Sequence, residues 1–154
     1  MQLREARTSD ANGLTRLLDQ LGYPGSEEFM TDRIRVLSEH PDAGILVCEV
    51  QSELAGFLAY QFFVQIGLSG AFCRITYFCV DSTFRGRGVG RLLETKLVSM
   101  AAQRGCDRIE LHCGIQRRDS HVFYKHMGYR ESPKYFTKSL RSSEPDDTDS
   151  SLCS

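Results

Sequence analysis

Residues 78–91 read Phe78-Cys79-Val80-Asp81-Ser82-Thr83-Phe84-Arg85-Gly86-Arg87-Gly88-Val89-Gly90-Arg91, an apolar run, a polar turn and a glycine-rich start to an amphipathic segment. Glycine lets backbone N–H groups approach an anion closely, and a helix N-terminus adds partial positive charge at the same point. The stretch therefore predicts a strand, a phosphate-binding loop and a helix in succession. The plain alternative is a turn without a ligand, but this concentration of glycine is a conformationally costly way to begin a helix.

Two other kinds of phosphate-binding loop fit this spacing poorly. A Walker loop ends in Gly-Lys-Ser/Thr, whereas this loop ends in Gly90-Arg91-Leu92. A dinucleotide-binding fingerprint would need glycine at position 91. Neither class of nucleotide site is therefore favoured.

The segments around this unit predict a single α/β domain. Before the loop, apolar alternation and helix-start signals predict a strand over 3–6, helices over 8–21 and 26–40, and strands over 44–50, 54–64 and 72–80. After it, we expect a helix over 88–105, a strand over 108–113, a helix over 119–127 and a last strand pair around Glu131 and over 134–140. The helix that follows the loop should bury Val89, Leu92, Leu93, Leu97, Met100 and Ala101.

Composition limits the partners that this chain can have. Its 154 residues suffice for one core, and 19 Lys plus Arg against 20 Asp plus Glu give no bulk charge for binding nucleic acid or an anionic membrane. No run of about 18 apolar residues and no apolar signal segment is present, so we expect a soluble, cytoplasmic protein. Residues 141–154, rich in Ser and Asp, are expected to form a disordered acidic tail on a domain over 1–140.

The six cysteines do not predict a metal or redox site. They lie at positions 48, 73, 79, 106, 113 and 153, with no close paired spacing. Cys48, Cys79 and Cys113 stand in apolar, strand-like runs, where a reduced cysteine behaves as a small core side chain. We therefore expect structural roles for these three.

Two motifs resemble the GNAT superfamily of N-acetyltransferases. Arg85, Gly88 and Gly90 fill the pattern R/Q-x-x-G-x-G/A of its acetyl-CoA loop, and residues 117–129 are similar to its helix carrying Phe-Tyr followed by a glycine and an aromatic residue. The resemblance covers about 3–140, and with residues 135–140 it is closest to aminoalkylphosphonate and other small-amine N-acetyltransferases. It implies the GNAT acyl-CoA N-acyltransferase fold, an α/β fold with a mixed, mostly antiparallel central sheet flanked by helices.

The same resemblance implies acetyl-CoA as cosubstrate. Backbone groups of Phe78, Cys79 and Val80 would pair with the pantetheine arm, which mimics a strand and therefore leaves the side chains free to vary. The pyrophosphate would be held by the loop residues Arg85, Gly86, Arg87, Gly88, Val89, Gly90 and Arg91.

Acetyl transfer to an amine needs a base, since an alkylammonium has a pKa of about 10, and an acid for the departing thiolate. The resemblance implies Tyr124 as that acid, its alternative being an ordinary aromatic core residue. Many relatives carry carboxylates in the strand before the loop, where this chain has Thr76 and Tyr77. That departure removes the commonest base and turns attention to the position that matches a glutamate in some relatives, His112.

Imidazole, with an ordinary pKa of about 6.5, accepts a proton at neutral pH, so His112 is the first candidate base. It could equally be a satisfied polar residue on the open face of a strand. Glu110, on the same face by alternation, would orient His112 or act as the base itself. His121 is a weaker candidate, and no ligand spacing requires a metal site built from His112 and His121.

These features favour an N-acetyltransferase that moves an acetyl group from acetyl-CoA to the primary amine of a small molecule. Two alternatives stay open. A protein N-terminal or lysine acetyltransferase would need an open groove for a peptide, and a catalytically inactive CoA-binding regulatory module would explain the missing carboxylates at Thr76 and Tyr77. A homodimer is also possible.

Overall fold

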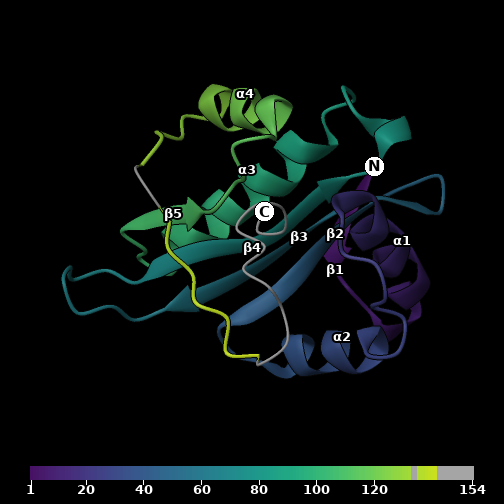
Figure 1. Ribbon diagram of the computed structural model, residues 1–154, viewed down its shortest axis with the longest axis horizontal. Helices are drawn as coiled ribbons and strands as arrows, with labels where there is room; N and C mark the ends of the chain where they lie inside the picture. The colour runs from purple at the N-terminus through teal and green to yellow at the C-terminus, as the bar shows by residue number, and fades with distance from the viewer. Residues whose placement is uncertain (133–134, 142–154) are drawn as a thin grey trace.

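A five-stranded sheet forms the middle layer of the fold (Figure 1), in the spatial order β1-β2-β3-β4-β5. The computed structural model describes residues 1–132 and 135–141. The strands are β1 (Gln2–Glu5), β2 (Ala43–Val50), β3 (Glu53–Phe63), β4 (Phe72–Val80) and β5 (Arg108–Leu111). The first four are antiparallel neighbours, whereas β5 is parallel to β4. This confirms the expected mixed, mostly antiparallel sheet.

Helices cover both faces of the sheet. The helix α1 (Ala11–Leu21), entered through the 3₁₀ turn η1 (Thr8–Asp10), packs with α2 (Met30–Glu39) on one face. The opposite face carries α3 (Val89–Gln103) and α4 (Arg118–His126) (Figure 1). A parallel strand pair needs a long crossover connection, and α3, preceded by the 3₁₀ turn η2 (Ser82–Phe84), supplies it between β4 and β5.

Each face of the sheet buries its own apolar cluster. The cluster under α1 and α2 includes Leu14, Leu17, Ile34, Val47 and Phe57. The cluster under α3 includes Leu46, Leu58, Ile75, Leu93 and Leu97. Cys48 and Cys79 are buried as predicted, and Cys113 is partly buried against the second cluster.

A register shift in β4 changes which side chains face which layer. Ala59 of β3 pairs with Tyr77, but the next residue, Tyr60, pairs with Ile75, so Thr76 is an extra residue on β4. Ile75 and Phe78 consequently both pack toward α3, while Tyr77 lies with the α1–α2 cluster.

The expected last strand pair is wrong for the described residues, which carry no strand at 129–132 or 135–141; positions 133–134 lie outside the description. A strand in this place would need a buried face, yet Phe136 and Leu140 are 84% and 94% exposed. The strand expected over 108–113 also ends earlier, at Leu111. Residues 142–154, which hold most of the expected tail, are outside the described part.

Two details of the helices also differ from expectation. On α3, Leu92 is exposed while Glu94 is buried, because Glu94 accepts a hydrogen bond from Tyr129 at 3.1 Å. The second helix begins at Met30 instead of Ser26, which lies in the preceding turn and accepts from the Met30 N–H at 3.0 Å. Within the described residues, no helix has both the length and the apolar character needed to cross a bilayer.

Gly56 provides a test of the packing between β3, β4 and α3. A Cβ atom there would lie 2.9 Å from the backbone oxygen of Cys79 and 3.0 Å from Val89. Gly56→Ala should lower the free energy of unfolding by about 1–3 kcal/mol, as overpacking does, in chemical denaturation. Gly67→Ala, whose Cβ would meet nothing closer than 3.5 Å, is the matched control and should change it by less than about 0.5 kcal/mol. Equal effects would contradict this account.

Candidate active site

The strands β4 and β5 part to form a fork. Their parallel register runs from Phe72↔Arg108 to Ile75↔Leu111, so residues 76–80 of β4 extend beyond the paired segment. The extra residue Thr76 lies at this branch point. An extended molecule can add to such a strand edge through main-chain hydrogen bonds, and this edge holds the predicted residues Phe78, Cys79 and Val80.

The glycine-rich loop begins where the fork ends. Gly86 and Gly88 have φ of +74° and +84°, which L side chains rarely adopt, and a Cβ on either would meet no atom within 4 Å. Gly88 is the N-cap of α3, and its carbonyl accepts from the Leu92 N–H at 3.0 Å. The loop is therefore open on its outer side at a helix N-terminus, which fits a phosphate group.

Arg85, Arg87 and Gly90 pack the loop against β4, η2 and α4. Arg85 Nε donates to the carbonyl of Val80 at 3.3 Å, and the Arg87 guanidinium lies 5.5 Å from the ring centroid of Phe84. Gly90 serves packing, since a Cβ there would lie 3.3 Å from the Phe123 ring. The absence of a side chain at Gly90 thus lets α4 approach the start of α3.

Tyr124 lies on the α3–α4 side of the fork. It is buried, with its ring centroid 6.3 Å from that of Phe78 on β4 and 5.6 Å from that of Tyr129. Tyr129 in turn donates to Glu94, and burial together with that carboxylate raises the pKa of Tyr129. The predicted acid is therefore held in an aromatic cluster that contacts β4 just past the branch point.

His112 lies just beyond the end of β5. Its ring stacks on Tyr135 at 4.1 Å between centroids. Burial lowers the pKa of His112, the positive charge of Arg74 lowers it further, and Glu110 acts in the opposite direction. The lowered pKa favours the neutral imidazole, which is the form that can accept a proton.

Glu110 is committed to an ion pair. Arg74, its register partner on β4, donates to its carboxylate through Nε at 3.0 Å and also through Nη2. The Arg74 guanidinium also stacks over Phe63, 5.0 Å from the ring centroid. Both Glu110 and Arg74 act electrostatically on His112. Because the Glu110 carboxylate is paired with Arg74, it is less available to accept a proton.

The other sequence candidates occupy separate positions. Tyr77, which stands where relatives have a carboxylate, contacts Tyr23 edge-on at 5.0 Å. His121 Nε2 lies 2.9 Å from the carbonyl oxygen of Gly114 and so interacts with the loop before α4. In the described part of the chain, no three or more His, Cys, Asp or Glu side chains are grouped to hold a metal ion.

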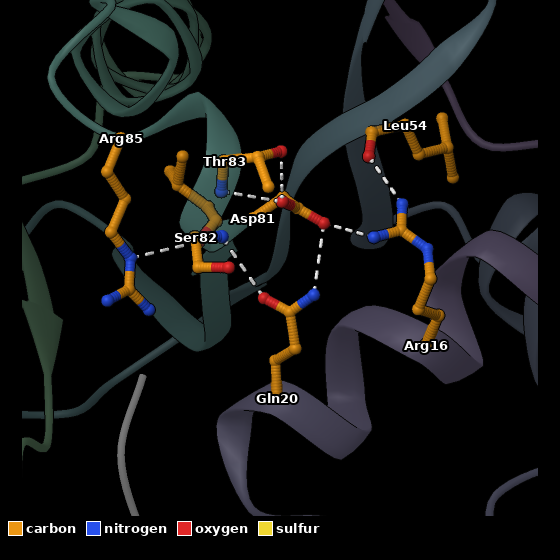
Figure 2. Close-up of polar contacts among 8 residues, drawn as sticks. Arg16, Gln20, Leu54, Asp81, Ser82, Thr83 and Arg85 are labelled. Carbon is orange, nitrogen blue, oxygen red and sulfur yellow. Dashed lines mark hydrogen bonds and ion pairs between the residues drawn. The ribbon is translucent and has the colours of Figure 1, made fainter.

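Sequence reasoning missed Asp81, which is buried at the base of the loop (Figure 2). Its carboxylate accepts hydrogen bonds from Thr83, Gln20 and Arg16. Burial acts to raise the pKa of Asp81, but these hydrogen bonds outweigh it and hold the pKa well below its usual range. The run Asp-Ser-Thr signals a capped turn, but nothing in the sequence indicates partners on α1.

An open pocket of about 630 Å³ lies beside this network, between α1, the β2–β3 turn and η2. Asp81, Arg16 and Asp10 are among the residues that line it. None of Tyr124, His112 and Glu110 lines this pocket, which is thus separate from the fork.

Comparison with known proteins identifies the family of this chain. The chain matches the acetyltransferase (GNAT) family model over residues 12–129. It belongs to this family. It is therefore an acyltransferase of the kind that transfers an acetyl group to nitrogen, and members of the family generally use acetyl-CoA as cosubstrate.

Individual relatives share about a quarter to a third of their aligned residues with this chain. An uncharacterized N-acetyltransferase of Methanocaldococcus jannaschii is 32% identical over 96 residues, which are 62% of this chain but only 42% of that protein. An aminoalkylphosphonate N-acetyltransferase of Salmonella typhimurium is 25% identical over 144 residues, covering 90% of this chain and 91% of that one.

A plant enzyme matches in sequence and in fold. Glucosamine 6-phosphate N-acetyltransferase of Arabidopsis thaliana is 27% identical over 150 residues, covering 88% of this chain and 96% of that one. The crystal structure of the enzyme superposes with a TM-score of 0.80 at 24% identity, over 91% of this chain and 98% of that chain. The superposition shows the shared fold.

The charges around His112 predict opposite effects of two substitutions. Arg74→Gln should raise the pKa of His112, because it removes a nearby positive charge, and Glu110→Gln should lower it. NMR titration of the ring protons would measure both, with the His112 resonances identified by their loss in His112→Gln. Shifts in the same direction, or none, would show that the ring lies away from the Arg74–Glu110 pair.

Proposed function

We propose that the chain transfers an acetyl group from acetyl-CoA to the primary amine of a small molecule, and that the reaction takes place in the fork between β4 and β5. The observation that carries this proposal is the continuity of the open edge of β4 with the glycine-rich loop. An extended thioester arm and an anionic end would each meet backbone groups suited to them.

The donor would lie along this continuous surface. Backbone groups of Phe78, Cys79 and Val80 would pair with the pantetheine arm. Acetyl-CoA would supply an acetyl group already activated as a thioester. The pyrophosphate would be held by backbone N–H groups and side chains of the loop, from Arg85 through Gly86, Arg87, Gly88, Val89 and Gly90 to Arg91.

His112 is the proposed base. It is the first residue beyond the paired part of β5, and its neutral imidazole can take a proton from the incoming ammonium. Glu110 is the weaker candidate because its carboxylate is paired with Arg74. We assign Glu110 an orienting role beside His112. His112 would take the proton from the amine directly or through a bridging water.

Tyr124 is the proposed acid. It lies with the α3–α4 cluster, whereas Glu110 and His112 project from β5 toward the opposite face by alternation. His112 would take a proton from the amine on one side of the fork, and Tyr124 would give its own phenolic proton to the thiolate on the other. The two residues therefore have separate roles and do not compete for one proton.

The acceptor class rests on relatives. Two of them are named for small amines that carry a phosphonate or phosphate group, and Arg74 offers a half-exposed cation beside His112. We therefore place amino-phosphonates and amino-sugar phosphates first among candidate acceptors. We further propose that 1–140 is the catalytic domain, that 141–154 is dispensable and that the protein acts in the cytoplasm.

The direct test is release of free CoA thiol from acetyl-CoA with a panel of acceptors. The panel should include aminoalkylphosphonates, glucosamine 6-phosphate, polyamines and peptides with free N-termini or lysines. We expect turnover with a small amine and a large loss of CoA affinity in Gly88→Val, because a side chain at φ +84° is strained by about 1–3 kcal/mol. Turnover with peptides alone, or unchanged CoA affinity in a folded Gly88→Val protein, would contradict the proposal.

The two proton-transfer roles predict separable kinetic defects. Tyr124→Phe and His112→Ala should each lower kcat by about 100- to 10,000-fold, with CoA affinity nearly unchanged in calorimetry. Because the neutral imidazole is the active form and its pKa is lowered, the rate should rise with pH through an ionisation below about 6.5. That limb should vanish in His112→Ala and persist in Glu110→Gln. Its persistence in His112→Ala would exclude His112 as the base.

A further inference from the structure

We infer that Asp81 is a positioning residue for the donor, because its carboxylate fastens the base of the phosphate loop to α1 through Gln20 and Arg16. This inference rests on the proposed function, since it requires that the loop hold the pyrophosphate of CoA. No part of the loop motif itself includes Asp81, Gln20 or Arg16.

The two oxygens of Asp81 have different partners (Figure 2). Oδ1 accepts from the backbone N–H of Thr83 at 2.8 Å and from its hydroxyl at 2.7 Å, which caps the turn η2. Oδ2 accepts from Gln20 Nε2 at 3.0 Å and from the Arg16 guanidinium. One oxygen therefore shapes the turn, and the other ties it to a helix more than sixty residues earlier in the chain.

Gln20 forms hydrogen bonds to the loop base through both the nitrogen and the oxygen of its amide. While Nε2 donates to Asp81, Oε1 accepts from the backbone N–H of Ser82 at 3.2 Å. Arg16 similarly joins the loop base to β3, donating to Asp81 and, at 2.9 Å, to the carbonyl of Leu54 at the start of β3. The Asp81 backbone N–H also donates to Ala55 at 2.9 Å.

These bonds fix the place where the loop leaves β4. The chain turns through η2 and reaches Gly86 and Gly88, where the lack of a Cβ makes the loop backbone adaptable. A glycine-rich loop that binds through backbone N–H groups needs an anchored base to present them in one arrangement. The buried carboxylate supplies that anchor from outside the loop.

Asp81→Asn separates the two roles of the carboxylate. The remaining oxygen can still cap η2, but the new NH₂ group would face the donors of Gln20 and Arg16. If Gln20 rotates its amide to accept from the new group, its own NH₂ then faces the Ser82 N–H. Either arrangement loses a hydrogen bond between α1 and the loop base.

The tie can be restored by exchanging donor and acceptor. In the double variant Asp81→Asn/Gln20→Glu, a carboxylate on α1 would accept from the new amide and from Ser82, and it would stay within reach of Arg16 at the i, i+4 spacing. Gln20→Glu alone would place two carboxylates together and should be defective. Rescue in the double variant would be difficult to explain by general damage to the fold.

The test compares donors with and without the pyrophosphate. In Asp81→Asn, calorimetric Kd for CoA and KM for acetyl-CoA should rise about 10- to 100-fold, as expected for a lost hydrogen bond to a charged group, while kcat changes little. The kcat/KM for S-acetylpantetheine, which lacks the pyrophosphate and the nucleotide, should be unchanged. The double variant should recover most of the affinity for CoA.

Asp10→Asn is the matched control. Asp10 is a second buried carboxylate on the same pocket, held by Arg4 at 2.7 and 2.9 Å and by the Arg7 N–H at 2.7 Å, away from the loop base. The Asp10→Asn variant should be less stable but should keep the wild-type preference for acetyl-CoA over S-acetylpantetheine. If Asp81→Asn does not fold, Gln20→Leu removes the two Gln20 bonds of the tie and leaves the Arg16 bonds, and it should also weaken CoA binding.

The outcomes distinguish a failure of the role inferred for Asp81 from a failure of the proposed function. Suppose that Gly88→Val loses CoA affinity but that Asp81→Asn and Gln20→Leu keep it within about twofold, a smaller change than the loss of one hydrogen bond would cause. The inference is then wrong and the proposed function stands. Equal losses with both donors would also overturn the inference, because they indicate general damage. If the wild-type protein does not bind CoA, both the proposed function and the inference fall.

Discussion

The extra residue Thr76 in β4 is the constraint on which the geometry of the site depends. A strand normally alternates its side chains between two faces, but the shift at Thr76 sends both Ile75 and Phe78 toward α3. β4 therefore changes phase at the point where β5 stops pairing with it. Before that point β4 is an interior strand of a sheet. Beyond it, β4 offers an edge, and this edge leads directly into the glycine-rich loop.

α1 contacts both the base of the glycine-rich loop and the start of α4. On one side, Gln20 and Arg16 bind Asp81 at the base of the loop. On the other side, Arg117, the N-cap of α4, donates to the carbonyl of Leu21 at the end of α1. The helix that carries Tyr124 and the loop proposed to hold the donor are thus both attached to one short helix. A change in the position of α1 would alter both together.

Local patterns predicted much of this arrangement. The glycine-rich loop, the strand before it, the helices on each side and the strand expected over 108–113 follow from spacing over a few residues. The mixed, mostly antiparallel sheet was implied by the family resemblance. The prediction of the last strand pair was wrong because apolar residues such as Phe136 and Leu140 are compatible with a strand but do not require one. Nothing in the local sequence shows that these side chains are exposed. Asp81 was missed for a related reason, since its partners on α1 are 61 and 65 residues away.

The proposed acceptor side of the fork has little net charge. Thr76 is uncharged, Tyr77 packs on Tyr23, and the charge of Glu110 is balanced by Arg74. A carboxylate base would favour a cationic acceptor by charge alone, and each anionic group on that acceptor would reduce the advantage. A neutral imidazole beside a half-exposed guanidinium lacks this bias. In the proposed mechanism, the substitution of histidine for a carboxylate therefore does more than supply a base, because it allows an amine that carries its own negative charge to approach the thioester without repulsion.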